Sequence, residues 1–509
     1  MMKKILCLGL CAALTAAGLA GCSTEQTDQS ASQDTVSAET TGTAAADAGT
    51  ETAAGETAAD PLRADEGTTI SVAHCQGEYI YESFYEISDK FTEMTGIEVE
   101  WIELPATDYD TWVTAQFAAG TEPDIFWNAP KEYFDQGKIM DLTAYYDQEN
   151  VFNGVTWKDC FTDGALVNSM STDGTKYIST AMTGFTFNLY YNKDIMEELG
   201  LGTEPPETFT EMIEMMKVCK EDGRYIPMSV QNLNDTNVGW LERIFMDDLF
   251  HNTDVVEKLD IITPNGAIDY PEAMLGLETG VLNYDDPRFE EYFTLMKDLT
   301  QYWNEDYNAA GWEYEGLFNN GEVLFNVNGG WYPGQVVENG YEVNYGAAPM
   351  PYVDSAYSEF GLDEPLLYAP PAGEAVFFIS QKCADEGRGD AAVKFLQFMT
   401  CPEGGAQMYI DAVMLGSCIK GVTLPEEVGA LANAETGDAV TTWVQLAFQF
   451  SDEAYSKYRE LYVAYLDPSS TQTAAELIAE LKEEVLPLLD EAIEDSTVDV
   501  MSYVDQVQG

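Results

Sequence analysis

Several side chains that could recognise a ligand come directly after expected strands. Trp127 and Asn128 end the apolar run 124–127, and Trp331 and Tyr332 follow the expected strand 322–327 and its glycines. Aromatic rings can stack on flat C–H faces, and amides can bond hydroxyl groups. Loops beyond the carboxyl ends of strands are the usual ligand sites of open α/β sheets. The candidate ligand-binding residues are Gln76, Glu78, Trp127, Asn128, Trp240, Trp331 and Tyr332.

The same inventory gives little support to catalysis or to metal binding. His74 and His251 are the only two histidines, and the cysteines show no metal-binding spacing. We therefore expect no metal, no cofactor and no Ser-His-Asp type of site. A surface glycoside hydrolase is the enzyme alternative, since acids and aromatic residues are abundant. It requires two carboxylates about 5 to 5.5 Å or about 6.5 to 9.5 Å apart.

The charge of the chain limits the class of partner. There are 89 acidic against 23 basic residues, for a net charge of −66. Nucleic acids and other polyanions would be repelled, so neutral or cationic ligands fit better. A receptor for a peptide or polyamine therefore stays open beside a receptor for a sugar.

The N-terminal region has the features of an exported protein. Lys3 and Lys4 precede an apolar run that is too short to span a membrane, which is typical of a secretory signal over residues 1–21. Residues 22–67 are rich in Ala, Thr, Gly, Ser and acids and contain no aromatic residue, which predicts a disordered linker.

The cysteines that remain after the signal and Cys22 could be paired or free. A Cys401–Cys418 disulfide is the closest local pairing, and buried free thiols are the alternative. The six cysteines concerned are Cys75, Cys160, Cys219, Cys383, Cys401 and Cys418.

The spacing of apolar residues predicts an α/β protein. Strands are expected at 69–73, 97–101 and 124–127, with helices between them that end at Gly96 and Gly120. Because short connections join these alternating elements, we expect parallel sheets covered by helices.

Farther along, Thr208 and Glu211 have the spacing of a capping box, which predicts a helix ending at Gly223. Asp286-Pro287 is expected to begin another helix, and Ala375–Ser380 is expected to be a strand.

Four motifs resemble those of the extracellular solute-binding proteins of bacterial ABC importers, in the branch that includes maltose-binding protein. They are PDIFW at 123–127, GKIMDLT at 137–143, YNKD at 191–194 and the segment that ends in Trp331. The resemblance implies a two-lobed, type II periplasmic-binding-protein-like fold, with mostly parallel sheets flanked by helices and hinge strands between the lobes. It divides the chain into a first lobe (68–184 and 372–420) and a second lobe (185–371 and 421–509). Crossings are expected near 184–189 and 370–373.

The resemblance also implies a function. Leu19-Ala20-Gly21-Cys22 is similar to a lipobox, so Cys22 would be lipidated and hold the protein on the outer side of the cell membrane. A monomer of this kind would bind a sugar or oligosaccharide without catalysis and deliver it to ABC permease subunits. In carbohydrate-binding members the residue that matches Trp331 stacks on the sugar.

Overall fold

The structure is a computed structural model. It describes residues 60–74, 80–104, 106–162, 164–184, 187–232, 237–264, 266–309, 313–365, 375–424 and 442–508.

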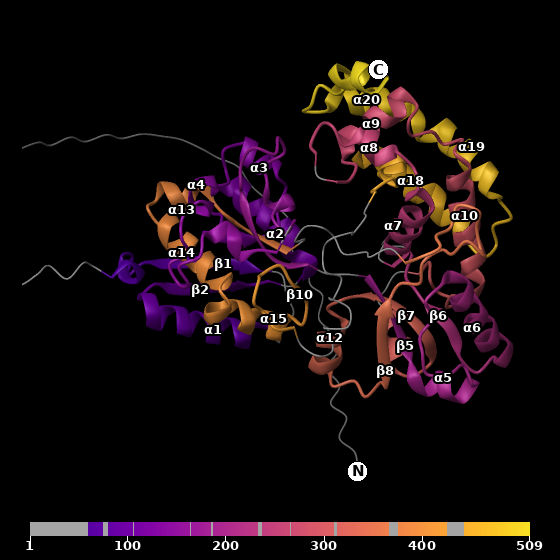
Figure 1. Ribbon diagram of the computed structural model, residues 1–509, viewed down its shortest axis with the longest axis horizontal. Helices are drawn as coiled ribbons and strands as arrows, with labels where there is room; N and C mark the ends of the chain where they lie inside the picture. Colours follow the sequence, from indigo (N-terminus) through magenta and orange to yellow (C-terminus); the bar gives the residue numbers. More distant parts are fainter. Residues whose placement is uncertain are drawn as a thin grey trace, which may run out of the picture. The chain divides into compact units, whose positions relative to one another are not determined.

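The first part of the chain and residues 375–417 build a six-stranded sheet, which with its helices we call the first lobe (Figure 1). The strand order is β10-β4-β9-β3-β1-β2. The strands are β1 (Thr69–His74), β2 (Glu98–Glu103), β3 (Ile125–Trp127), β4 (Ser179–Gly184), β9 (Ala375–Ile379) and β10 (Gly416–Ser417).

The sheet is mixed, which corrects the expectation of mostly parallel strands. β1 pairs in parallel with β2 and β3, as the β-α-β spacing predicts. β9 is antiparallel to both β3 and β4, and β10 is antiparallel to β4. The antiparallel strands come from a segment far along the chain, whose direction no local pattern fixes.

The helices of the first lobe are amphipathic and bury their apolar faces. Phe84, Ile87 and Phe91 of α1 are fully buried in the same core as Ile70 and Val72 of β1. These helices are α1 (Ile80–Thr95), α2 (Ala106–Ala119), α3 (Glu132–Asp135), α4 (Thr143–Tyr146), α13 (Gln381–Asp385), α14 (Gly389–Met399) and α15 (Gln407–Val413).

The last residues of the expected linker are structured. Pro61–Arg63 form a short 3-10 helix capped by Asp60. The buried ammonium of Lys394 pairs with Asp65 at 2.9 Å and donates to the Pro61 carbonyl at 3.0 Å. Residues 60–67 are therefore attached to the first lobe, although their composition resembles that of the residues before them.

A second, four-stranded sheet in the order β6-β7-β5-β8 forms the centre of what we call the second lobe. The pair β6–β7 is parallel, whereas β5 is antiparallel to β7 and β8, so this sheet is also mixed. The strands are β5 (Phe187–Asn192), β6 (Ile226–Ser229), β7 (Val323–Gly329) and β8 (Tyr345–Pro349).

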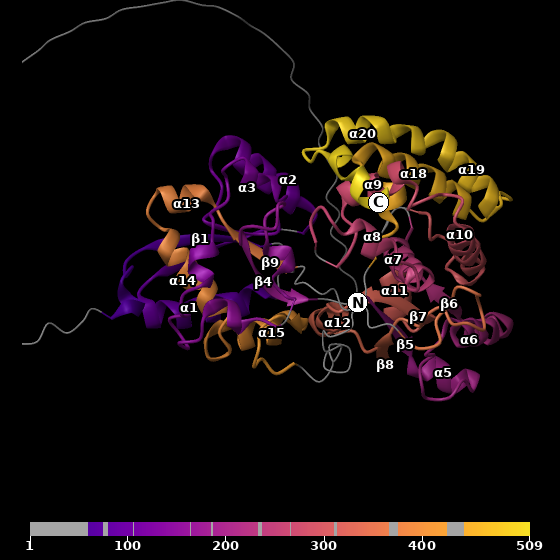
Figure 2. The ribbon, with the colours of Figure 1, turned by 45° about the horizontal axis from the view of Figure 1, so that its top comes forward.

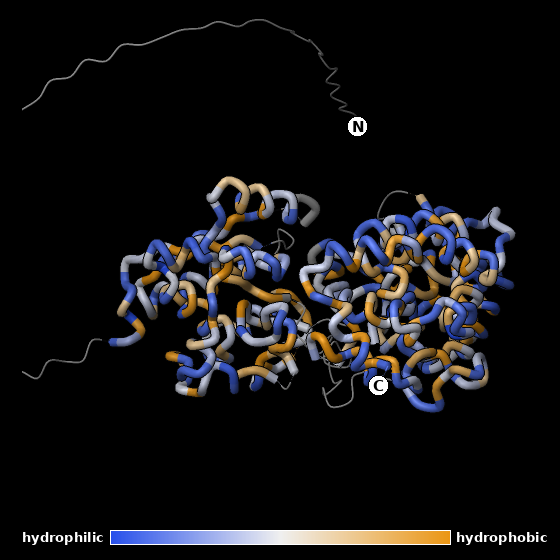
Figure 3. The backbone as a smooth tube through the Cα atoms, turned by 90° about the horizontal axis from the view of Figure 1, so that it is seen from above, coloured by the Kyte–Doolittle hydropathy of each residue, from blue (hydrophilic) through white to orange (hydrophobic). Residues whose placement is uncertain are grey.

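The second lobe contains many helices, several of which pack on one another rather than on the sheet. In Figures 1 and 2, α18, α19 and α20 lie together with α9 and α10. Figure 3 shows hydrophobic and hydrophilic residues alternating along the helices, as expected when one face of each is buried. The helices are α5 (Lys193–Leu199), α6 (Phe209–Asp222), α7 (Asn237–Phe250), α8 (Val255–Leu259), α9 (Tyr270–Thr279), α10 (Pro287–Leu299), α11 (Glu313–Asn319), α12 (Tyr332–Asn339), α17 (Leu446–Gln449), α18 (Asp452–Leu466), α19 (Ala474–Glu484), α20 (Leu489–Asp495) and α21 (Val504–Gln508).

The helix ends predicted from the sequence are confirmed for α6 and α10. The capping box at Thr208 and Glu211 begins α6, which ends at Gly223 with a left-handed φ of 73°. Asp286 caps α10 with Pro287 at its first position. In addition, the side chain of Asn192 accepts from Ile195 N–H and caps α5.

The first expected crossing falls between β4, which ends at Gly184, and β5, which begins at Phe187. The expected return crossing at 370–373 lies outside the described residues. Of the described helices, none combines the length and apolar character needed to cross a bilayer.

Five of the cysteines are buried free thiols: Cys160, Cys219, Cys383, Cys401 and Cys418. The suggested Cys401–Cys418 disulfide is therefore not formed, and the free-thiol alternative holds for these residues. Cys75 lies outside the described residues.

Candidate functional site

Trp127 lies at the carboxyl end of β3, where its backbone is tightly held. Its N–H donates to the Tyr109 hydroxyl at 2.7 Å, and that hydroxyl donates to the Trp127 carbonyl. The side chain is only partly buried, yet its indole N–H is covered and has no hydrogen-bond partner among the described residues. A covered donor without a partner is uncommon, and the indole N–H of Trp303 is a second example among the described residues.

His74, at the end of the neighbouring strand β1, lies beside Trp127. The ring centroids of His74 and Trp127 are 5.2 Å apart, because parallel β1 and β3 end side by side. Burial lowers the pKa of His74 to about 3, so its imidazole is neutral. This strand edge thus carries an uncharged aromatic surface.

Asn128 has a structural role that its sequence position does not reveal. Its φ of 39° is left-handed, and its N–H donates to the Val376 carbonyl at 2.9 Å. Its side-chain Oδ1 accepts from the Val376 N–H at 3.1 Å. Asn128 was expected to bind a ligand, but its side-chain oxygen extends the pairing with β9.

In the second lobe, the candidate residues Trp240 and Trp331 contact each other, a pairing that the sequence did not predict. Their rings meet edge to face, with centroids 5.6 Å apart and planes at 78°. Phe187 of β5 stacks on Trp240, with ring centroids 4.6 Å apart. Both tryptophans are partly buried, so this aromatic trio has exposed ring surface that a ligand could contact.

Gly329 permits this arrangement. A Cβ at Gly329 would lie 2.3 Å from carbons of the Trp331 ring, so only glycine lets the ring lie over the strand. The Asn328 side chain next to it accepts from Gly329 N–H and donates to Glu315, each at 2.8 Å. Burial raises the pKa of Glu315, against the effect of the bond from Asn328.

Tyr332 is not a surface contact, which corrects the sequence prediction. Its side chain is fully buried with Tyr190, Phe318 and Val323. Its hydroxyl donates to Asn319. The remaining candidates, Gln76, Glu78 and the lipidation residue Cys22, lie outside the described residues.

The sequence did not identify Trp443, which joins the candidate residues on structural grounds. Its φ of 56° is uncommon for a bulky residue, and its ring is partly buried. The guanidinium of Arg243 lies 4.0 Å from the ring centroid, and Arg243 is three residues after Trp240 on α7. No local pattern signals left-handed backbone at a tryptophan, because glycine and asparagine normally occupy it.

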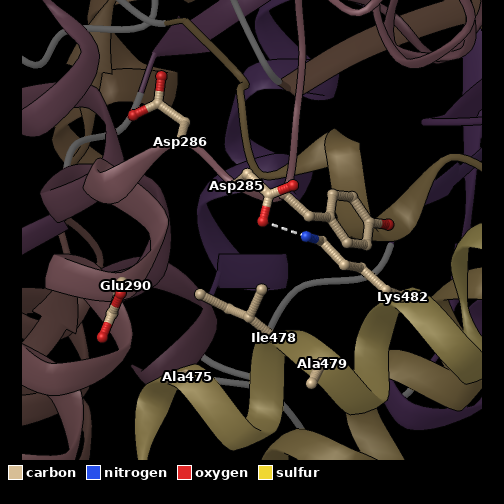
Figure 4. A pocket seen from close by; sticks show the side chains of 8 residues that line it. Asp285, Asp286, Glu290, Ala475, Ile478, Ala479 and Lys482 are labelled. Atoms are coloured by element: carbon tan, nitrogen blue, oxygen red, sulfur yellow. Dashed lines mark hydrogen bonds and ion pairs between the residues drawn. The ribbon is translucent and has the colours of Figure 1, made fainter.

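Two cavities of the second lobe lie apart from these rings. One, of about 220 Å³, lies between α10 and α19 (Figure 4), where Lys482 pairs with Asp285. The other, of about 550 Å³, is lined by Ile226 and other residues beside β6. Within the described part of the chain, no group of three or more His, Cys, Asp or Glu side chains could hold a metal ion.

Each of the two sheets thus has aromatic side chains near the ends of its strands, where a ligand could be bound. A sequence profile for "Bacterial extracellular solute-binding protein" matches residues 86–436, and the chain belongs to this family. The resemblance inferred from the motifs is confirmed.

Two curated relatives are aligned over part of their lengths. The sn-glycerol-3-phosphate-binding periplasmic protein UgpB of Rhizobium meliloti is 26% identical over 50% of this chain and 52% of its own. The erythritol/L-threitol-binding protein of Mycolicibacterium smegmatis is 30% identical over 29% of this chain and 33% of its own. The chain thus spans about half or less of the length of these relatives.

Solved structures support the two-lobed fold. The solute-binding protein RafE in complex with raffinose aligns with a TM-score of 0.60 at 20% identity, over 83% of this chain and 100% of that one. Maltose-bound MalE3 of T. maritima gives 0.59 at 20% identity, over 82% and 99%. The predicted fold class is confirmed, with mixed sheets as the correction.

Proposed function

We propose that this solute-binding protein captures a sugar or a related polyhydroxylated solute between its two lobes and delivers it to an ABC permease. The observation that carries the proposal is the aromatic trio of Phe187, Trp240 and Trp331 at the exit of β7. Rings of this kind stack on sugar C–H faces, while nearby amides and carboxylates bond hydroxyl groups.

The first lobe would add a complementary contact. The Trp127 indole N–H is a covered donor without a partner among the described residues, and a ligand hydroxyl would satisfy it. Closure of the lobes on the solute would give the permease two distinguishable shapes. The relatives are named for polyhydroxylated ligands, namely glycerol phosphate, erythritol and threitol. Structural neighbours contain raffinose and maltose.

The same reasoning assigns no catalytic step to this chain. The family and its neighbours are described as binding proteins, and His74 is neutral inside an aromatic surface. We propose a monomer that binds and releases its solute unchanged, without a cofactor.

A thermal-shift screen tests the class of ligand. A solute that binds the native state stabilises it by mass action and so raises the melting temperature. At a solute concentration of one hundred times Kd, the gain in folding stability is about 2.7 kcal/mol. The screen contains mono- and oligosaccharides, polyols, sn-glycerol 3-phosphate, amino acids and polyamines. Shifts confined to amino acids or polyamines would contradict the proposal.

Trp331→Ala tests the aromatic trio with the best ligand of that screen. Losing a stacked ring should weaken binding at least tenfold, which is about 1.4 kcal/mol, measured by calorimetric titration. Because Trp331 is only partly buried, the loss of folding stability should stay below the roughly 3 to 5 kcal/mol of a core tryptophan.

The neighbouring Tyr332→Phe is the matched control. It removes a buried hydroxyl that donates to Asn319 and should cost about 1 kcal/mol of stability while Kd stays unchanged. A Trp331→Ala variant that is badly destabilised yet binds normally would remove Trp331 from the site.

We further propose that Cys22 is lipidated and holds the protein on the outer side of the membrane, after removal of residues 1–21. Several acyl chains on one cysteine give the two or more hydrophobic signals that stable anchoring requires. Cys22→Ala should release the protein from washed membranes into the soluble fraction, detected by immunoblotting. Full retention of the variant would contradict the anchor.

A further inference from the structure

The backbone that presents Trp443 is held in an unfavourable conformation. Its φ of 56° lies in the left-handed region, which costs a bulky residue about 1 to 3 kcal/mol. Such a conformation persists only where neighbouring contacts impose it.

Asp247 of α7 supplies those contacts. Its side chain is fully buried, and its Oδ1 accepts from the Thr442 N–H at 2.8 Å and also from the Thr442 hydroxyl. The Val444 N–H in turn donates to the Thr442 hydroxyl at 3.3 Å. The carboxylate therefore holds Thr442 directly, and the Thr442 hydroxyl in turn holds Val444 on the other side of Trp443.

The same helix contacts the ring. Trp240, Arg243 and Asp247 are three and then four residues apart, so they share one face of α7. Arg243 covers the Trp443 ring at 4.0 Å, and Trp240 meets Trp331. One face of α7 thus carries Trp240 and, through Arg243, contacts the ring of Trp443.

We propose that Asp247 is a positioning residue for ligand binding, whose charged carboxylate fixes Thr442 and thereby the ring of Trp443. The inference rests on the proposed function and adds Trp443 to it as a further ring for the solute, because Arg243, which covers that ring, lies one helical turn from Trp240. Hydrogen bonds to a charged acceptor are about twice as strong as those to a neutral one. The position of Trp443 therefore depends on the protonation of Asp247.

The surroundings of Asp247 shift its pKa into a pH range in which binding can be measured. Burial raises the pKa of Asp247 to about 6, against the bonds from Thr442 and the charge of Arg243. Asp248 is also buried, its pKa lies well above the usual range, and it accepts from Val353 N–H. Glu272, whose pKa burial raises to about 7, lies close to the same segment. Its carboxylate accepts from the N–H groups of Ile262 and Asp269, and the neighbouring Ile268 N–H donates to the Thr442 carbonyl.

Stability and binding should respond to pH in opposite directions. Because the folded pKa of Asp247 is raised, its contribution to stability is present below its unfolded pKa and is lost as pH rises through about 6. Binding depends instead on the charged form, so it should weaken as pH falls through the same value. A group with only a structural role would not separate these two profiles.

The test measures Kd by titration calorimetry between pH 5 and 8, with the saccharide that gives the largest thermal shift as probe, beginning with raffinose. Wild-type Kd should rise about three- to tenfold on going from pH 8 to pH 5. Asp247→Asn should bind weakly with a flatter profile across this range. Thr442→Val, which loses the hydroxyl, should also bind weakly, whereas Thr442→Ser should restore the wild-type value.

Hydrogen exchange at the Thr442 amide gives a readout without ligand. Its protection factor should fall at acid pH in the wild type and be low at every pH in Asp247→Asn. If Asp247→Asn binds with wild-type affinity and pH dependence, the proposal is overturned. If the Trp331→Ala variant loses binding but Trp443→Ala does not, the proposed function stands and the positioning role of Asp247 falls.

Discussion

At the scale of single residues, substitution of Trp127 tests whether its indole N–H contributes to ligand binding. Trp127→Phe removes a donor that has no partner among the described residues, so folding stability should be unchanged or rise by about 1 kcal/mol. Affinity for a hydroxylated ligand should fall by about 0.5 to 1.5 kcal/mol, or about two- to tenfold.

Trp157→Phe is its matched control in the same lobe. The fully buried Trp157 indole donates to the Thr400 hydroxyl at 2.8 Å. Loss of this hydrogen bond should cost about 1 kcal/mol of folding stability, which is measured as a lower melting temperature. Kd should not change in this control. Equal effects of the two substitutions on stability and binding would argue that the Trp127 donor is not aimed at a ligand.

Residue types could be predicted from the sequence better than their orientation. Trp331 and Tyr332 are adjacent aromatic residues after the same strand, yet only Trp331 is partly exposed. The difference arises because α12 begins at Tyr332, whose ring turns into a core built from β5, β7 and α11. No spacing in the sequence specifies that turn, and Trp443 was missed because its position depends on Asp247, 196 positions away in the chain.

At the scale of elements, the capping box of α6 should make a measurable contribution. The Thr208 hydroxyl accepts from the Glu211 N–H at 3.2 Å, while the Glu211 carboxylate accepts from Thr208 N–H. Thr208→Ala should cost about 1 kcal/mol of stability, measured by urea unfolding. Thr208→Ser should recover most of it, and a loss with both substitutions would assign the effect to packing.

This capping box could be predicted because its two residues are three positions apart in the sequence. The direction of the strands could not be predicted, because paired strands come from distant parts of the chain. The β-α-β spacing correctly gave β1, β2 and β3 as parallel neighbours. The antiparallel partners β9 and β10 arrive from residues 375–417, after the whole second sheet. Local periodicity contains no information about the direction in which such a strand returns.

At the scale of the whole molecule, buried carboxylates should shape the dependence of stability on pH. Burial raises the pKa of Glu272 to about 7, although its carboxylate accepts backbone N–H groups from Ile262, Thr263 and Asp269. Since the folded pKa is raised, this contribution is complete below the unfolded pKa and is lost as pH rises through about 7. Its size is on the order of 3 kcal/mol.

Asp124 acts in the opposite direction. Its burial raises the pKa, but bonds from Arg388 and Ser71 outweigh burial and lower it. The stability from this pair is therefore present above the unfolded pKa and is lost as pH falls through the lower, folded value. Together these groups predict greatest stability near pH 4 to 5 as their combined effect, with a decline toward pH 8 that comes from Glu272 and Asp247.

Glu272→Gln tests this decline, because glutamine resembles the protonated acid. The variant should melt close to the wild type at pH 4, and its melting temperature should fall less between pH 4 and pH 8, measured by calorimetry. Glu272 is the third residue of α9 and completes a capping box with Asp269. Glu476→Gln is the matched control, since Glu476 has the same position in the capping box of α19 but is exposed and has a lowered pKa. Its removal should leave the decline above pH 5 intact, so parallel profiles for Glu272→Gln and wild type would show that Glu272 does not titrate in this range.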